Sequence, residues 1–354
     1  MGRHIVSTAL LSLAAAFLAA CGGGEDATPT ATSEPPPAST EAATAAPSAE
    51  ATAANGGGGD TSGLPEAPVL GAFVDAGEST VRVNTVAEPE TVNMIDPIPD
   101  GLRLVSIDVS MVAKSYGKEY NKLFFGLLRA DGQNIAIRVE PGVSGPGNPG
   151  ALQLVPRQPP LKAGSLFNGN LVRGWVHSLV PEDSGPLLFA VLNDAGDDWV
   201  ALAIVDGAAE PGPGTGPPMP GVSAGLPLIS AEGTSTMSPI GGSGYEILEV
   251  LDPAPTNDDA PDGMRFVALN IRQTALQADE RINLLDFAVQ DADGYLYYAF
   301  FDLGMARPNF QSSQGGESGE GFVTFAILED AELVSVLAQP DFMAPHEHIA
   351  RFGE

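Results

Sequence analysis

The chain has 354 residues, of which 45 are Asp or Glu and 16 are Lys or Arg, so its net charge is −29 at pH 7. Nucleic acids and anionic membrane surfaces attract clustered Lys and Arg, and this charge therefore excludes nucleic acid as an expected partner. The single cysteine excludes an intrachain disulfide, a zinc site with several thiolates and a Cys-x-x-Cys redox pair. The length suffices for two ordinary domains.

The N-terminus has the pattern of a secretory signal. Residues 5–20 are uncharged and apolar, follow Arg3, and end in the small residues Ala19 and Ala20. As a helix they would span about 24 Å, which is less than a hydrocarbon core of about 30 Å. We therefore expect residues 1–20 to be a signal peptide rather than a permanent membrane helix.

Leu18-Ala19-Ala20-Cys21 resembles the lipobox of bacterial lipoprotein precursors. The resemblance implies cleavage between Ala20 and Cys21, diacylglyceryl transfer to the Cys21 thiol, and acylation of the freed amino group. The only cysteine of the chain stands where this chemistry requires it. Membrane lipid attached through Cys21 is thus the expected anchor, and the protein is expected to be extracytoplasmic on a bacterial cell membrane.

The segment after Cys21 has the composition of a tether. Residues 22–63 include no aromatic, basic or large aliphatic residue. They cannot bury enough apolar area to offset the backbone ordering cost of about 1–2 kcal/mol per residue. We expect residues 21–63 to be the lipidated cysteine and a disordered tether.

An internal repeat organises the remaining sequence. Three landmarks recur 162 residues apart, namely Gly63-Leu64-Pro65 and Gly225-Leu226-Pro227, Asp100-Gly101-x-Arg103 and Asp262-Gly263-x-Arg265, and Asp131-Gly132 and Asp293-Gly294. A constant offset at separated landmarks indicates two copies of one domain. Gly174 and Gly321, which start later matching segments, are 147 residues apart, so the first copy has 15 extra residues within 141–160.

The expected boundaries follow from these landmarks and from composition. They are repeat 1 at 64–207, a Pro/Gly-rich linker at 208–224, repeat 2 at 225–338 and a C-terminal tail at 339–354. The linker centres on residues 211–221, which cannot continue a sheet or a helix. We expect it to carry few contacts and the two copies to fold independently.

Within each copy apolar residues alternate with a period of two, which predicts half-buried strands. In residues 102–112, Val105, Ile107, Val109 and Met111 form one face, while Leu104, Ser106, Asp108 and Ser110 form the face expected to meet solvent. In the second copy, Val267, Leu269 and Ile271 oppose Ala268, Asn270 and Arg272.

Asp131-Gly132 and Asp293-Gly294 each separate two apolar runs and predict hairpin turns, because glycine tolerates a positive φ. Further strands are expected at 81–87, 169–180, 187–192, 199–205, 245–251, 320–328 and 332–338. Outside residues 1–20 the sequence has no amphipathic helical pattern of ten or more residues. The predicted fold class is all-β, with two tandem antiparallel immunoglobulin-like β-sandwiches.

These motifs, together with Leu161-Lys162-Ala163-Gly164 and the segment from Gly169 to Pro181-Glu182-Asp183, resemble a family of bacterial lipoprotein domains of unknown function. That family has an immunoglobulin-like sandwich and is similar in fold to the mycobacterial immunoprotective secreted antigen. The resemblance covers both copies, although Leu328 replaces the proline before Glu-Asp in the second. It implies no catalytic residue.

Three constellations are weighed as chemical sites. Ser115-x-x-Lys118 has the spacing of acyl-enzyme serine hydrolases, but it lacks their partner motifs and lies in a loop after a strand. His346-Glu347-His348 offers two imidazoles, yet we expect it to be solvated in the tail. Asp291-x-Asp293-Gly294 and Asn257-Asp258-Asp259 with Asp262 supply oxygens suited to Ca²⁺, although turn capping explains them equally. We therefore expect no enzyme activity, no cofactor and no metal.

Trp175 and Phe322 occupy equivalent repeat positions and are expected in the core, and His177 is expected to face solvent. Loops on a rigid scaffold are the better candidates for recognition. The loop candidates are residues 141–160, with Asn148 and Arg157, and residues 302–318, with Arg307 and Phe310.

Two function classes remain open beside a less favoured Ca²⁺-binding or other metal-handling role. The sequence favours a membrane-anchored lipoprotein that presents two modules for binding or adhesion to an envelope or extracellular protein. The alternative is a passive structural or assembly component of the cell envelope.

Overall fold

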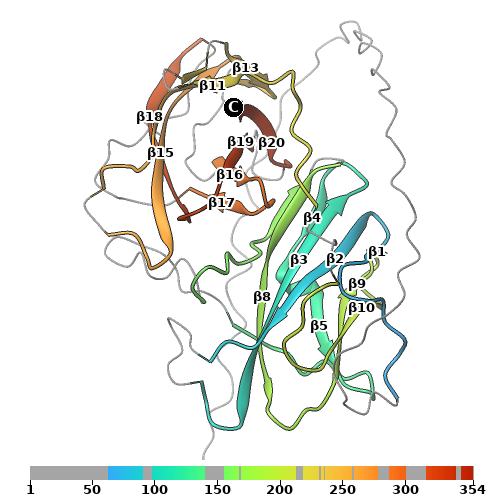
Figure 1. The fold of residues 1–354 in the computed structure, drawn as a ribbon. Helices are drawn as coiled ribbons and strands as arrows, with labels where there is room; N and C mark the ends of the chain where they lie inside the picture. Colours follow the sequence, from blue (N-terminus) through green and yellow to red (C-terminus); the bar gives the residue numbers. More distant parts are fainter. Residues whose placement is uncertain are drawn as a thin grey trace, which may run out of the picture. The chain divides into compact units, whose positions relative to one another are not determined.

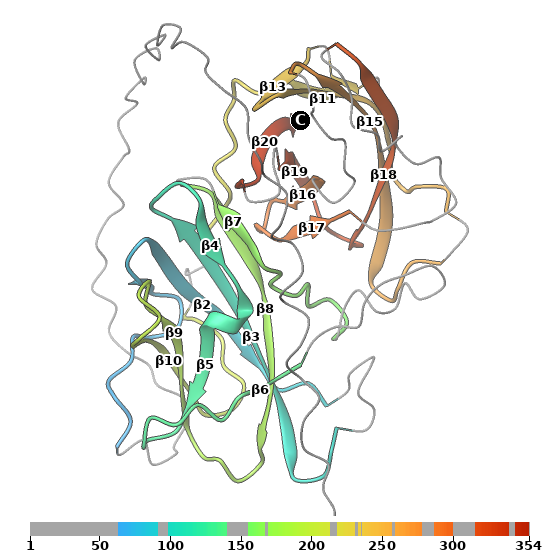
Figure 2. The same cartoon turned by 180° about the vertical axis from the view of Figure 1, so that it is seen from behind.

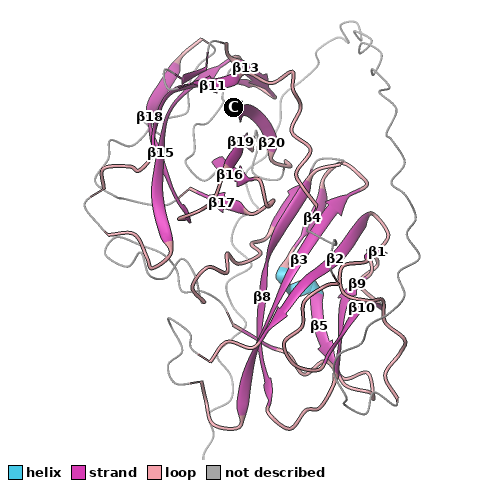
Figure 3. Cartoon of the chain, viewed as in Figure 1, coloured by secondary structure: helices cyan, strands magenta, loops and turns pink. Residues whose placement is uncertain are grey.

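The chain is all-β, as its alternating apolar pattern predicts, and the fold class is confirmed. In the computed structural model the one helical element among the described residues is a single 3-10 turn, η1 (Lys122–Phe124), and strands make the framework (Figure 3). The described residues are 63–90, 98–139, 155–166, 169–212, 218–230, 233–234, 236–256, 259–277, 287–299, 316–339 and 344–353.

Repeat 1 contains a five-stranded sheet of order β1-β2-β3-β8-β6, a three-stranded sheet of order β10-β9-β5, and a short pair of β4 with β7 (Figures 1 and 2). All of these pairings are antiparallel. The strands are β1 (Phe73–Asp75), β2 (Ser79–Ala87), β3 (Leu102–Ala113), β4 (Lys118–Tyr120), β5 (Phe125–Leu128), β6 (Ile137–Arg138), β7 (Gly164–Leu166), β8 (Leu171–Pro181), β9 (Leu187–Leu192) and β10 (Trp199–Val205).

Repeat 2 contains a four-stranded sheet of order β13-β14-β15-β18 and a six-stranded sheet of order β12-β11-β20-β19-β16-β17. Its pairings are antiparallel except that β11 runs parallel to β20. The strands are β11 (Leu228–Ser230), β12 (Gly233–Thr234), β13 (Ser238–Ile240), β14 (Ser243–Leu251), β15 (Met264–Ala275), β16 (Phe287–Asp291), β17 (Leu296–Tyr298), β18 (Ser318–Leu328), β19 (Leu333–Ala338) and β20 (Glu347–Phe352).

The two repeats share one strand order. The series β1-β2-β3-β8 corresponds to β13-β14-β15-β18, and β10-β9-β5 corresponds to β20-β19-β16. Even an irregularity recurs, because the register shifts between Val83 and Thr85 on β2 and between Ile247 and Glu249 on β14. A bulge kept at the same place in both copies is a designed feature of a sheet, so the sequence repeat is also a structural repeat.

The core of repeat 1 lies between its two sheets. Val105, Ile107 and Val109 of β3 are buried in it, as their alternation predicts. Opposite them, the rings of Phe125 and Phe189 stack with centroids 5.4 Å apart. Burial of such side chains contributes about 1.5–3 kcal/mol each, so this layer stabilises the fold of repeat 1.

The two Asp-Gly turns differ in the strand pairing across them. Gly132 and Gly294 both have a positive φ, of 79° and 89°, as hairpin turns require. In repeat 2 the turn joins β16 to β17 in an antiparallel hairpin, as predicted. In repeat 1 the apolar runs before and after the turn form β5 and β6, which belong to different sheets, because β5 pairs with β9 and β6 pairs with β8. Between the two runs the described pairing is a single isolated bridge of Leu128 with Asn134.

The prediction of a solvent-facing side on β3 is wrong. Leu104, Ser106, Asp108 and Ser110 are all buried. One reason is segment 159–161, which forms backbone hydrogen bonds with Trp175 of β8. Trp175 N donates to the Pro159 oxygen at 2.8 Å, and Leu161 N donates to the Trp175 oxygen at 2.9 Å. The other reason is the β16–β17 hairpin of repeat 2, which reaches Asp108.

His177 was also expected to face solvent, and this prediction is wrong for the same reason. Its side chain is buried on the covered face of β8, with Nδ1 2.9 Å from the Ser106 hydroxyl. Burial, together with the charge of Lys122, lowers the pKa of His177 to about 3. The imidazole is therefore neutral at pH 7.

The segment after residue 338 was expected to be a tail, yet it contains β20. This strand pairs antiparallel with β19 and completes the sheet of repeat 2. His346, expected to be solvated, is buried beside the Tyr298 ring with centroids 5.4 Å apart. Burial lowers the pKa of both His346 and His348 to about 4.

The two repeats share contacts despite the Pro/Gly-rich linker. All described residues belong to one compact unit, and the hydrophobic cluster of repeat 1 includes Ala288, Leu296 and Leu337 of repeat 2. Conversely, Trp175 packs in the cluster of repeat 2. The expectation of few contacts between the copies does not hold, because side chains of each continue the core of the other.

Candidate functional site

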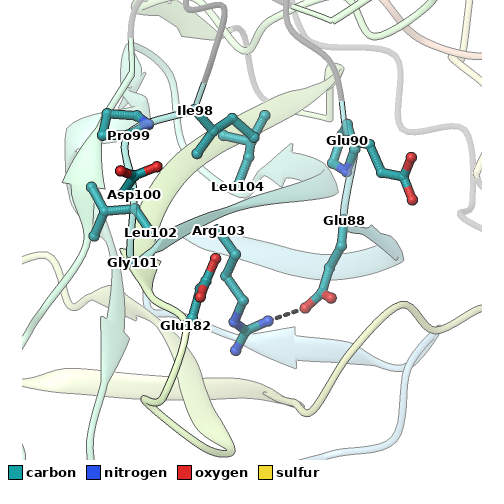
Figure 4. A pocket seen from close by; sticks show the side chains of 11 residues that line it. Glu88, Glu90, Ile98, Pro99, Asp100, Gly101, Leu102, Arg103, Leu104 and Glu182 are labelled. Carbon is teal, nitrogen blue, oxygen red and sulfur yellow. Dashed lines mark hydrogen bonds and ion pairs between the residues drawn. The ribbon is translucent and has the colours of Figure 1, made fainter.

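A pocket of about 620 Å³ opens in repeat 1 between the end of β2 and the start of β3 (Figure 4). Its lining comes from the loop before the Asp-Gly-x-Arg motif, from the motif itself and from the turn after β8. The lining residues are Glu88, Pro89, Glu90, Ile98, Pro99, Asp100, Gly101, Leu102, Arg103, Leu104 and Glu182.

Charge in this pocket is predominantly negative. Arg103 forms an ion pair with Glu88, and the two side chains are 21% and 32% exposed (Figure 4). Glu90, Asp100 and Glu182 add three further carboxylates. With one guanidinium against four carboxylates, the pocket favours a positively charged group.

The apolar part of the pocket is anchored in the body of the repeat. Leu104 is buried in a small cluster with Val139, Val155 and Leu179, and Ile98 and Leu102 pack against that cluster. Val155 comes from the stretch that distinguishes repeat 1 from repeat 2, so this apolar cluster contains a residue that repeat 2 lacks.

The equivalent position in repeat 2 is closed by hydrogen bonds. Arg265, the counterpart of Arg103, donates through Nε and Nη2 to Asp252, at 2.9 and 3.1 Å, and Asp252 is the counterpart of Glu88. Its other donors reach the backbone oxygens of Leu328, Glu329 and Ala331. All five N–H groups of a guanidinium are thereby used.

Arg103 has only the contact with Glu88 among the described residues, so it keeps free donors toward the pocket. The turns nearby differ in length: β8 and β9 are separated by residues 182–186, whereas β18 and β19 are separated by residues 329–332. The shorter turn of repeat 2 is the one whose carbonyl groups satisfy the arginine. The repeats have thus diverged at this site.

A second polar cluster lies where the repeats meet. Arg173 donates to Asp108 through Nε, at 3.1 Å to Oδ1 and 2.9 Å to Oδ2, and through Nη2, at 2.6 Å to Oδ2. From repeat 2, the Tyr295 hydroxyl donates to Asp108 Oδ2 at 3.3 Å and accepts from Trp175 Nε1 at 3.1 Å. Burial raises the pKa of Asp108, and the guanidinium of Arg173 opposes that rise.

Asp291, considered above as a Ca²⁺ ligand, has protein donors. The Tyr297 hydroxyl donates to its Oδ2 at 2.7 Å, and Tyr295 N donates to its Oδ1 at 2.9 Å. Burial raises the pKa of Asp291 to about 6. Asp293 lies 3.6 Å from Arg173, and no group of three or more potential metal ligands occurs within the described ranges. Asn257 and Asp258 lie outside those ranges.

The Ser-x-x-Lys spacing does not form a catalytic pair. Lys118 starts strand β4 instead of standing one helical turn after Ser115, and its amino group forms an ion pair with Asp194. A lysine that serves as a base must reach the serine hydroxyl, and here it is held by a carboxylate from the β9–β10 loop. This geometry favours a structural role.

One predicted loop residue is described, and it contacts the other repeat. Arg157 has a φ of 61° and forms an ion pair with Asp330 in the turn after β18. A Cβ on Gly263 would come within 3.1 Å of the Arg157 Cγ. The residue thus joins the repeats. Asn148, Arg307, Phe310, Ala20 and Cys21 lie outside the described residues.

Trp175 and Phe322 were both expected in the core, and only Trp175 is a core residue. It lies opposite Asp108 on the face of β8 away from the layer between the sheets of repeat 1, and it is buried in the hydrophobic cluster of repeat 2. Phe322 pairs with Asn270 and packs, half-buried, against a small satellite cluster that includes Met264 and Phe266. Both rings lie outside the layer between the sheets.

The pocket and the interface cluster were not identified from the sequence. The repeated Asp-Gly-x-Arg motif does contain a usable signal, because an acidic residue stands 15 positions before Arg103 and 13 before Arg265. That pattern predicts an ion pair, but it does not reveal which of the two arginines keeps free donors. Whether the remaining donors of the arginine are bonded depends on the backbone at the end of β18 or β8 and in the turn that follows, which lies far from the motif in sequence.

Comparison of the chain with family models, curated proteins and solved structures finds no match. No helix in the described part of the chain is both long and apolar enough to cross a membrane.

Proposed function

We propose that this chain is an extracytoplasmic bacterial lipoprotein, held on the cell membrane by lipid at Cys21, whose two immunoglobulin-like repeats bind an envelope or extracellular protein without enzymatic activity. The observation that carries the binding role is the acidic pocket at Arg103. The equivalent site of repeat 2 is filled by its own backbone, whereas the repeat 1 site is open.

The chemistry of the pocket supports a lysine or arginine side chain of a protein partner as its occupant. Such a side chain combines an apolar stem with a cationic head. Ile98 and Leu102 offer an apolar surface for the stem, and Asp100, Glu90 and Glu182 offer carboxylates for the head. The net charge of −29 would add long-range attraction to a basic partner.

The binding role is tested by affinity capture with the full, C-terminally tagged chain from detergent-solubilised envelopes. The double variant Asp100→Asn/Glu182→Gln removes two charges from the pocket, and we expect it to lose at least tenfold of the captured partner. The control, Glu119→Gln, removes one charge at an exposed position of β4, outside the pocket, and should capture normally. Equal capture by all three proteins would leave a passive envelope component as the better description.

The anchor is tested separately. Cys21 has the only thiol of the chain, so Cys21→Ala should abolish the lipid mass at the mature N-terminus and release the protein from membranes. Two acyl chains are needed for stable attachment, since one gives only marginal binding. A membrane-bound mature form of Cys21→Ala would refute the lipoprotein assignment and leave the binding experiment unaffected.

A further inference from the structure

Within the described part of the chain, strand β10 has one unpaired edge. It lies at the end of the order β10-β9-β5, in the smaller sheet of repeat 1 (Figure 2), and β9 is its one partner among the described strands. No strand or loop among the described residues forms a backbone hydrogen bond with the other edge of Trp199–Val205. An edge of this kind presents a row of N–H and C=O groups that can pair with another chain.

Repeat 2 shows what occupies the equivalent edge. There β11 runs parallel to β20, with Leu228 opposite Arg351 and Ile229 opposite Phe352, and Arg351 N donates to the Pro227 oxygen at 3.0 Å. The landmark alignment equates β11 with residues 66–68 of repeat 1, which form no strand. Pro68 has no N–H to donate, whereas the equivalent residue in repeat 2 is Ser230.

The N-terminal segment of repeat 1 packs elsewhere. Leu64 and Ala67 pack against a cluster of Leu128, Leu188 and Ala190, to which Trp199 and Ala201 of β10 also add their side chains. They cover side chains, not the backbone edge. Repeat 1 therefore lacks the strand that completes the sheet of repeat 2.

The side chains of β10 do not protect its edge. All seven residues of Trp199–Val205 are apolar. Proteins commonly guard an unpaired edge with charges or proline, yet here the charges are on the paired strand, where β20 carries Glu347 and Arg351. The unpaired strand is thus apolar and the paired strand carries the charges, which is the opposite of what protection of a free edge requires.

Acidic residues flank the edge at both ends. Asp197 and Asp198 precede β10, and Asp206 follows it. A second copy of a chain with net charge −29 would bring like charges together, which opposes self-pairing. The complementary occupant is an apolar extended segment with basic residues beyond its ends.

We propose that β10 is a strand-addition site, at which an extended apolar segment of a partner protein, flanked by Lys or Arg, pairs in parallel as β11 pairs with β20. Main-chain hydrogen bonds supply affinity in this mode, and the side chains and flanking charges supply selectivity. The site does not depend on the pocket at Arg103, which is lined by other residues.

The probe is a synthetic peptide of residues 226–230, Leu-Pro-Leu-Ile-Ser, which include β11, with two lysines added at each end. Binding to the full chain in detergent is followed by fluorescence anisotropy and by amide hydrogen exchange. We expect saturable binding and at least tenfold slower exchange in β10. A peptide N-methylated at alternate residues, and one with glutamates in place of the lysines, should each bind at least tenfold more weakly.

Two matched variants locate the site. Ile204→Lys places a charge on β10 and should weaken binding of the lysine-flanked peptide at least tenfold. Ile137→Lys makes the same change on β6, an edge strand of the other sheet where Ile137 is 53% exposed, and should leave binding unchanged. Melting temperatures of both variants show whether the fold is kept.

Three results would overturn the proposal. The first is no saturable binding of the probe up to about 1 mM. The second is equal binding of the N-methylated peptide, which would mean that backbone pairing is not involved. The third is a dimer of the full chain in sedimentation that Ile204→Lys abolishes, which would make a second copy the occupant.

Discussion

Arg173 and Asp108, on neighbouring strands of repeat 1, form a bidentate ion pair that repeat 2 seals from water. The Asp108 carboxylate has no exposed surface, and the Tyr295 ring of repeat 2 lies 4.4 Å from the Arg173 guanidinium carbon. An ion pair in this position couples the repeats, because their separation would expose it. We therefore expect the intact chain to unfold in one thermal transition rather than in two.

Replacing Asp108 with alanine tests this pair. Arg173 would remain charged and buried without its partner, because a guanidinium keeps its proton in proteins even when burial lowers its pKa. Breaking a buried pair on one side costs about 3–5 kcal/mol, which calorimetry would register as a large fall in melting temperature. Lys114→Ala, which breaks the exposed pair with Asp75 and leaves the hydrogen bond from Gly77 N to Asp75 in place, is the control and should change the melting temperature far less.

The docking of the hairpin is tested by a matched pair of glycines. Gly294→Ala and Gly132→Ala each place a side chain at a positive φ, in equivalent turns. A Cβ at Gly294 would also come within 2.8 Å of Leu171 Cδ2 in repeat 1, whereas one at Gly132 meets nothing within 4 Å. We expect Gly294→Ala to cost about 1 kcal/mol more in the free energy of unfolding. Equal costs in denaturant titrations would argue against a packed interface.

The alternation of apolar and other residues along the sequence was sufficient to predict β3 and β15 and the side of each strand that faces the core. Val105, Ile107 and Val109 lie in the core as expected, and so do Val267 and Leu269. These residues follow rules of period two that depend only on their own strand. The repeated landmarks predicted two copies of one domain, and the strand order of the two repeats agrees with that prediction.

The outer face of β3 was not predictable by the same rule. Ser106 and Asp108 have the polarity of solvent-facing residues, and Asn270, the equivalent of Asp108 in repeat 2, is half-buried. What buries Asp108 is a hairpin about 190 residues away in sequence. Polarity on that face therefore marks an interface with hydrogen bonds, and a single sequence does not distinguish it from a wet surface.

Acid should destabilise the fold through its buried histidines. The pKa of His177 is lowered to about 3, and those of His346 and His348 to about 4, against about 6.5 when unfolded. Below pH 6.5 these histidines bind protons in the unfolded chain but stay neutral in the native state, so the free energy of unfolding falls as the pH drops toward 4. The loss from His346 amounts to about 2–3 kcal/mol near pH 4.5.

The measurement compares denaturant unfolding at pH 7 and pH 4.5 for the intact chain and for His346→Phe. Phenylalanine keeps a ring against Tyr298 but binds no proton, so this variant should lose less stability on acidification. Asp291 acts in the opposite direction, because its pKa is raised to about 6 and its protonation favours the native state as the pH falls through that value. Asp291→Asn should consequently enlarge the acid-induced loss.

The divergence of the two arginines gives the last prediction. Arg265→Lys removes a planar group that reaches Asp252 and three backbone oxygens at once, and lysine has neither the donors nor the geometry to replace it. Arg103→Lys exchanges a guanidinium whose one partner among the described residues is Glu88 for an ammonium that can still form that ion pair. We expect a clear fall in melting temperature for Arg265→Lys and little change for Arg103→Lys, while the latter reshapes the pocket and alters partner capture. If both variants melt alike, the two sites are equivalent after all, and the open pocket loses its significance as the feature that distinguishes repeat 1.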